Sequence, residues 1–315
     1  MRRLALAATF VLAFSTSAHA LLVQGYEADV NERFASGFAS APVANTDPNF
    51  LLAGYDLSGV GWRDNSTQFA VTLISPKHFL TAAHVAPVVD LLLPPTVSFL
   101  GKDGGVRSYA VESVSTLQYN GQNTDLALGR LGKAVDTDFI TFYGGLFLGN
   151  TAADYQDLPV TLYGANGQVG SNTIDGVGNF DLLPFGGGNG TVDTVVSLTD
   201  YDPVTGEAQV QDGESGSPTF VRIAGNQLAL FGIHSAVATG GGVQFTLDSL
   251  PFFSAYSQIN NTLIADGYNN GWGVYVSGVI SPSTIPEPAS AATFLGAAAL
   301  ALGGLRRQRT PTRSA

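Results

Sequence analysis

Residues 213–218 read Gly-Glu-Ser-Gly-Ser-Pro, which places Ser215 between two glycines and ahead of a proline. Two other motifs precede this hexapeptide: residues 81–84 read Thr-Ala-Ala-His, and residues 124–128 read Thr-Asp-Leu-Ala-Leu. Each motif alone is weak evidence, because each also occurs in ordinary turns and loops. Their combination is more informative, since it presents His84, Asp125 and Ser215 in that order, 41 and 90 residues apart.

These three residue types supply what nucleophilic attack on a carbonyl group needs. A serine hydroxyl is too weak an acid to attack without a base, and an imidazole can accept its proton and return it near neutral pH. A carboxylate can hold the imidazole in one tautomer and stabilise its protonated form. The sequence therefore predicts Ser215 as nucleophile, His84 as general base and Asp125 as the residue that orients His84.

In residue identity, order and spacing, the three motifs resemble those of the chymotrypsin family of serine proteases, over roughly residues 60 to 250. The resemblance implies an all-β fold of two six-stranded antiparallel β-barrels with a short C-terminal helix, with His84 and Asp125 on the first barrel and Ser215 on the second. It also implies a polypeptide substrate and an oxyanion hole formed by the backbone N–H groups of Gly213 and Ser215. An α/β-hydrolase would present the order Ser, Asp, His, so chain order excludes that fold.

The serine motif departs from the family pattern at two positions, because Glu214 and Ser217 stand where an aspartate and a glycine are usual. In zymogen-activated members that aspartate pairs with a freed N-terminus reading Ile-Val-Gly-Gly, and this tetrapeptide is absent from the sequence. The sequence therefore gives no support for activation by propeptide cleavage. Bacterial members related to the glutamyl endopeptidases also carry Gly-x-Ser-Gly-Ser-Pro.

Three residues are expected to bind the substrate. Gln209 stands six positions before Ser215, where trypsin-like members carry an aspartate, so a preference for Lys and Arg is not expected. Residues 232–235, Gly-Ile-His-Ser, resemble the segment of glutamyl endopeptidases whose histidine binds an acidic side chain. This implies that role for His234, a preference for Glu before the scissile bond, and a place for Ser235 facing the bound peptide. The alternative for His234 is a histidine packed within a strand.

The rest of the body has the pattern of an all-β protein. Apolar and β-branched runs recur at short intervals and are separated by Gly, Asn, Asp and Pro. The helix formers of residues 254–264 predict a short terminal helix, and His78 is expected to be an ordinary loop residue. The expected strands are Phe69–Ile74, Val97–Leu100, Tyr109–Val114, Val160–Tyr163, Val192–Leu198, Thr219–Val221 and Leu228–Ile233.

The N-terminus predicts export. Two arginines, the apolar run of residues 4–14 and the small residues of Ala18-His19-Ala20 form the pattern of a secretory signal peptide over residues 1–20. We expect signal peptidase to cut after Ala20, so that the mature chain begins at Leu21. An N-terminal core helix is the alternative.

The C-terminus carries a second expected signal, over residues 286–315. It begins with Pro-Glu-Pro, continues with seventeen uncharged residues and ends in a basic segment that includes Arg306 and Arg307. An apolar segment of this length barely spans a bilayer, and the arginines favour the cytoplasmic side. The pattern resembles the PEP-CTERM sorting signal of Gram-negative bacteria, which implies transient membrane anchoring, processing by an exosortase and a secreted or cell-surface location. A plain membrane anchor is the alternative.

Composition limits the other functions. The body between the two signals has 8 Lys and Arg and 24 Asp and Glu, a net charge of −16, which argues against nucleic acid as a partner. The sequence has no cysteine, and the body's three histidines lack the spacing of metal ligands, so neither a metal nor another cofactor is expected. We expect an N-terminal segment and first barrel over residues 21–140, a second barrel and terminal helix over 141–265, and a linker over 266–285.

Two rival functions belong to other classes. One is a catalytically silent, surface-held binding module that keeps the protease fold, since a fold does not guarantee its function. The presence of the three motif residues and of Gly213 argues against such a loss. The other is a structural protein of the extracellular matrix, which would account for the acidic body and the C-terminal signal but for none of the motifs.

Overall fold

The computed structural model describes residues 21–63, 66–90, 92–148, 155–182, 192–201, 206–240, 243–268, 273–276 and 279–281. The expected signal peptide, residues 1–20, and the expected sorting signal, residues 286–315, lie outside these ranges. Within the described ranges, no helix combines the length and the hydropathy that a membrane crossing needs.

Six antiparallel strands close into a barrel, in the spatial order β4-β5-β6-β9-β8-β7. Its interior is filled by apolar side chains, among them Phe79 and Phe99. Gly129 lies opposite Phe79 in the β6–β9 pairing, and any side chain at Gly129 would overlap the Phe79 ring, so glycine here makes room for the aromatic core. The strands are β4 (Val60–Arg63), β5 (Ala70–Leu73), β6 (His78–Ala82), β7 (Thr96–Leu100), β8 (Val106–Tyr119) and β9 (Gln122–Leu131).

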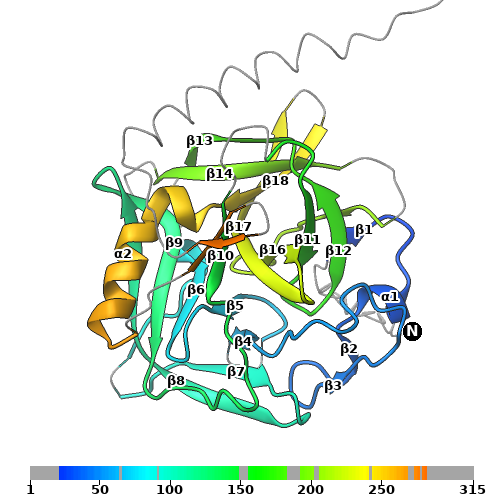
Figure 1. The fold of residues 1–315 in the computed structure, drawn as a ribbon, viewed down its shortest axis with the longest axis horizontal. Helices are drawn as coiled ribbons and strands as arrows, with labels where there is room; N and C mark the ends of the chain where they lie inside the picture. Colours follow the sequence, from blue (N-terminus) through cyan, green and yellow to red (C-terminus); the bar gives the residue numbers. More distant parts are fainter. Residues whose placement is uncertain are drawn as a thin grey trace, which may run out of the picture.

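A second β unit follows the barrel in the chain and packs against it (Figure 1). Strands β6 and β9 are buried on both faces: Phe79 points into the barrel, while Leu80 and Leu126 join an apolar cluster that includes Phe231 and Ile233 of the second unit. This arrangement explains why residues 78–82 form an unbroken buried run instead of an alternating one. The ends of β6 and β9 are thereby placed beside the second unit.

In the part of the chain that the structure describes, the second unit is one ten-stranded sheet that curls as a half-barrel. Its antiparallel part runs β12-β11-β16-β17-β18-β14-β13, and β10 adds in parallel to β17 and β19. The strands are β10 (Gly145–Leu148), β11 (Pro159–Tyr163), β12 (Val169–Thr173), β13 (Gly176–Leu182), β14 (Val192–Asp200), β16 (Pro218–Ile223), β17 (Gln227–Gly240), β18 (Val243–Ser249), β19 (Gly273–Val276) and β20 (Val279–Ser281).

The expected fold class is confirmed: the structure is mostly β, with a closed six-stranded barrel, a second curled sheet and a helix near the C-terminal end of the described chain. Two details differ from expectation. Over the described residues, the second sheet has ten strands instead of six. Strands β19 and β20 also fall in the segment expected as a linker, where β19 pairs with β10.

The N-terminal segment ties the two units together. It contains β1 (Leu22–Val23), α1 (Ala28–Asn31), β2 (Phe34–Ser36) and β3 (Val43–Ala44), and β1 pairs with β15 (Ala208–Gln209). Arg33 is buried, and its Nη1 donates to the carbonyl oxygen of Val60 in the barrel and to the Tyr163 hydroxyl in the second unit. A charge-assisted hydrogen bond of this kind fixes the barrel relative to the sheet.

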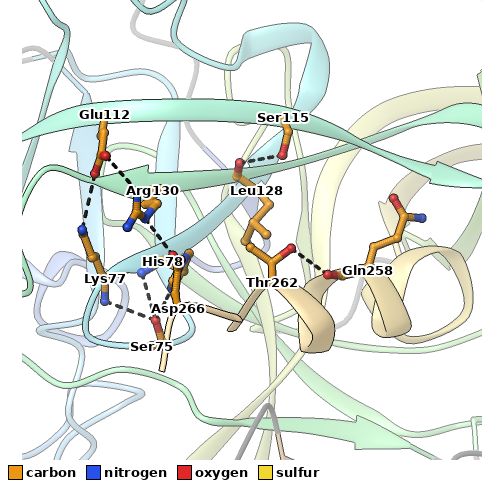
Figure 2. A network of polar contacts seen from close by, with 10 residues as sticks. All are labelled: Ser75, Lys77, His78, Glu112, Ser115, Leu128, Arg130, Gln258, Thr262 and Asp266. Atoms are coloured by element: carbon orange, nitrogen blue, oxygen red, sulfur yellow. Dashed lines mark hydrogen bonds and ion pairs between the residues drawn. The ribbon is translucent and has the colours of Figure 1, made fainter. Parts of the chain in front are cut away.

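Helix α2 (Pro251–Ala265) packs across β8 and β9 of the barrel (Figure 1). At its end, Asp266 Oδ2 lies 2.8 Å from His78 Nε2 and 2.7 Å from Arg130 Nε, and His78 Nδ1 lies 2.8 Å from the Ser75 hydroxyl (Figure 2). His78 is therefore not the loop residue that we expected. It is a fully buried residue of β6, and burial lowers its pKa below the ordinary value.

Candidate active site

His84 stands where β6 leaves the barrel. The strand ends at Ala82, and His84 follows in the 3₁₀ turn η1 (Ala83–Val85) with 14% of its side chain exposed. The hydroxyl of Thr81 donates to the carbonyl oxygen of Ala70 on β5, at 3.0 Å, which holds the end of β6 against its neighbour. The imidazole thus projects from a rigid barrel rim while remaining accessible.

Asp125, on β9, holds this imidazole from two directions. Its side chain is 4% exposed, and both carboxylate oxygens lie 2.9 Å from His84 Nδ1. The backbone N–H of His84 also donates to Asp125 Oδ1, at 3.0 Å. Because ring and backbone are fixed by the same carboxylate, the other ring nitrogen, Nε2, is turned toward the second unit.

Ser215 belongs to the second unit and lies in the loop between β15 and β16. Its Oγ lies 2.9 Å from His84 Nε2. The loop is shaped by two glycines with positive φ, Gly213 at 92° and Gly216 at 88°. A Cβ at Gly216 would stand 2.7 Å from the carbonyl oxygen of Ala70, the same oxygen that accepts the Thr81 hydroxyl. Close approach at Gly216 therefore lets the serine loop dock directly on the strands that carry His84.

The backbone around Ser215 leaves two donors available. The N–H of Gly216 donates to His234 O, and the N–H of Ser217 donates to Glu214 O, so these groups are used by the fold. In the described part of the chain, the N–H groups of Gly213 and Ser215 donate to no protein acceptor. Both are free to bind an oxygen atom of a ligand beside the serine.

Glu214 anchors the loop from beneath and is fully buried. Its Oε2 accepts the backbone N–H of Ala165 at 3.0 Å, while its Oε1 has no partner among the described residues. Burial raises the pKa of this carboxyl to about 7, and the nearby His234 opposes the shift. The side chains of Glu214 and Leu21 both lie against Gly164, so the expected start of the mature chain is close to this carboxyl group.

A cleft of about 410 Å³ opens at Ser215 and His84. One wall comes from the barrel side and includes Gln68, Phe69 and Val85. The other comes from the second unit and consists of residues 210–213 and 235–237. Ser235, one of the expected substrate-binding residues, therefore lines the cleft.

Gln209 and His234 do not line this cleft, which corrects two expectations. Gln209 is 1% exposed and lies in β15, paired with Leu22. His234 is fully buried, with its Nδ1 2.5 Å from Asp248 Oδ1, and the Thr219 hydroxyl donates to the other Asp248 oxygen at 2.5 Å. The alternative weighed for His234, a histidine packed in a strand, describes what the structure shows.

Some residues of the site escaped sequence reasoning. Asp212 and Val210 adjoin the serine motif and line the cleft, and proximity to Ser215 was the signal that could have identified them. Val237 lines the cleft two residues after Ser235, but Ala236 between them lines it too, because the β17–β18 register shifts after His234, so alternation along β17 gave no signal for Val237. Across the described residues, no cluster of His, Cys, Asp and Glu is arranged to hold a metal ion.

Fold and site together define an all-β protein in which Asp125, His84 and Ser215 form a hydrogen-bonded chain at the junction of a closed barrel and a second sheet.

No model of a known protein family and no curated protein matches this chain. Among solved structures, an inactive mutant of the murine norovirus NS6 protease aligns at 18% identity and a TM-score of 0.35, covering 59% of this chain and 90% of its own. Kallikrein-related peptidase 10 aligns at 18% identity and a TM-score of 0.40, covering 65% and 95%. Its complex with Zn²⁺ aligns at 17% identity and 0.39, covering 67% and 98%. With scores this low, we draw no conclusion about activity from these likenesses.

Proposed function

We propose that this protein is a serine endopeptidase that hydrolyses peptide bonds through an acyl-enzyme. The observation that carries the proposal is the unbroken chain of 2.9 Å contacts from the Asp125 carboxylate through His84 to Ser215 Oγ, at the wall of a cleft. A base that lies within hydrogen-bond distance of both a nucleophile and an orienting group is the geometric signature of an activated serine.

The chemistry follows from the positions of these atoms. As Ser215 Oγ bonds to the substrate's carbonyl carbon, its proton passes to His84 Nε2, and Asp125 stabilises the imidazolium that forms. The oxyanion would accept hydrogen bonds from the N–H groups of Gly213 and Ser215. His84 then returns the proton to the departing amine. A water molecule repeats the sequence on the ester, which regenerates Ser215 and releases the acid.

The two walls of the cleft favour a polypeptide as the substrate. They come from different β units and meet at Ser215, so an extended chain crossing the serine can contact one wall on each side of the scissile bond. The preference for Glu that the sequence resemblance implied is not carried into this proposal, because His234 is buried and bound to Asp248.

We further propose that the enzyme acts outside the cytoplasm. Support comes from the sequence alone: the signal-peptide pattern of residues 1–20 and the sorting-signal pattern of residues 286–315. On this proposal, signal peptidase and an exosortase are its processing partners, and the C-terminal segment anchors the chain transiently in the membrane.

Hydrolysis of a fluorogenic peptide mixture by the purified protein tests the enzymatic proposal. Ser215→Ala should lower kcat/KM by about 10³-fold or more, because it removes the nucleophile. Ser113→Ala, at an exposed serine of β8, is the matched control and should leave turnover unchanged. Peptide binding without turnover by the wild-type protein would support the silent binding module instead.

A further inference from the structure

The cleft has an aliphatic wall and an acidic residue at its mouth, and the proposed chemistry uses neither. Beside Ser215, the wall from the second unit presents the aliphatic side chains of Val210, Ala236 and Val237. Val210 is 3% exposed and Val237 is partly buried against the main apolar cluster, so both are held by packing and offer a fixed surface. This wall is suited to an aliphatic side chain of the bound peptide.

The described residues of the cleft carry formal charge of one sign. Among those that line it, Asp212 is the only carboxylate, and none is Lys or Arg. Asp212 is exposed and immediately precedes Gly213, so its charge stands at the mouth of the cleft near the reacting serine. Within the described part of the chain, Asp212 has no ion-pair partner. The histidine that could have balanced it, His234, is bound to Asp248 beneath the surface.

We propose that this cleft selects peptides with a small or medium-sized aliphatic residue before the scissile bond, and that Asp212 disfavours acidic residues at that position. The proposal rests on the peptidase function proposed above and names the substrate class of the same site. It replaces the acidic preference that the sequence resemblance implied.

The sizes of the expected effects on binding distinguish an aliphatic side chain from a charged one before the scissile bond. Burying a side chain of the size of Val or Leu favours binding by about tenfold or more. An exposed ion pair, which a basic side chain would make with Asp212, changes an equilibrium by about fivefold at most. A carboxylate brought to about 4 Å from Asp212 in water is disfavoured by about fivefold. The expected order is therefore aliphatic, then basic, then acidic.

The decisive comparison uses peptides that differ only in Gln or Glu before the scissile bond, because these side chains have the same shape. Wild-type protein should cleave the Gln peptide about fivefold faster in kcat/KM, and Asp212→Asn should bring the ratio close to one. Taking a ratio removes any general effect of the substitution on the neighbouring Gly213. Asp138→Asn removes the same charge at an exposed site outside the cleft and should leave the ratio unchanged.

A second comparison tests the aliphatic wall. Val237→Ala removes two methyl groups from the wall, so the ratio of kcat/KM for Phe over Val peptides should rise by about tenfold. Preference for Glu over Gln in the wild type, preference for Lys or Arg over Leu, or ratios unaffected by Asp212→Asn and Val237→Ala would each overturn the proposal. Failure of the peptidase function has a different signature, because no peptide of any sequence would then be cleaved.

Discussion

Replacing Asp125 by asparagine keeps the shape of this side chain while removing its charge, and the structure indicates which atoms will change partner. The backbone N–H of His84 donates to Asp125 Oδ1, so the amide oxygen of asparagine should remain at that position. The amide nitrogen then replaces Oδ2, 2.9 Å from His84 Nδ1. An amide donor there stabilises the tautomer in which Nε2 carries the proton, and that tautomer cannot accept the proton of Ser215.

Two contributions determine how far Asp125→Asn should lower kcat. A carboxylate about 4 Å from the charge centre of an imidazolium stabilises it by about 4 kcal/mol at the effective dielectric constant of a partly exposed site. Because about 1.4 kcal/mol corresponds to tenfold in rate, loss of this charge alone should lower kcat by about 10³-fold. The wrong tautomer adds to this, and about 10⁴-fold is the loss expected for the two together.

Single-turnover acylation with a fluorogenic peptide measures this step without interference from product release. Thermal unfolding of the same sample shows whether the variant is folded, and Asp138→Asn controls for the loss of one negative charge elsewhere. A folded Asp125→Asn variant that acylates within tenfold of the wild type would refute the role assigned to Asp125.

The remaining predictions concern the serine loop and the chain ends. Gly216→Ala should lower the free energy of unfolding by roughly 3 kcal/mol or more, because the added Cβ meets Ala70 O at 2.7 Å. The control Gly225→Ala, at a glycine with φ 79° and no atom within 4 Å of the added Cβ, should lower it by about 1–2 kcal/mol. Equal losses of the two variants in denaturant unfolding would contradict this prediction. Burial raises the pKa of Glu214 from 4.5 to about 7, so between these pH values the folded state keeps a proton that the unfolded state has lost. In a chain that retains residues before Leu21, and so has no free amino group at Leu21 near Glu214, the free energy of unfolding should therefore fall by about 3 kcal/mol as pH rises through this window. Glu214→Gln should abolish this fall. The same pH dependence in the wild type and in Glu214→Gln would contradict the prediction. Intact mass of protein from the native cell surface should match a chain from Leu21 to about residues 286–288, and retention of residues 306–315 would favour a plain anchor.

Sequence reasoning was most informative where a residue type, an order and a spacing carried the information. His84, Asp125 and Ser215 were predicted from three short motifs to act together, and in the structure Asp125 and Ser215 each lie 2.9 Å from His84. The strands were recognisable because apolar runs between turn residues are a local signal. Residues 251–265 form the expected helix in nearly its expected place.

The sequence failed where a side chain's partner is distant in the chain. His234 faces Asp248 across the β17–β18 pairing, and the register shifts just after His234, so simple alternation does not tell which side chains reach the cleft. His78 contacts Asp266, which lies 188 residues away in the chain at the end of the terminal helix. These pairings depend on the packing of the two units, which no local motif encodes.

Covalent labelling with a fluorophosphonate tests the central claim most directly, because the reagent phosphonylates a serine whose hydroxyl is activated by a neighbouring base. Our account predicts that the purified protein takes up one phosphonyl group, that peptide mapping places it on Ser215, and that Ser215→Ala abolishes the reaction. A folded wild-type protein that stays unlabelled, or one that carries the label on a different serine, would contradict the account.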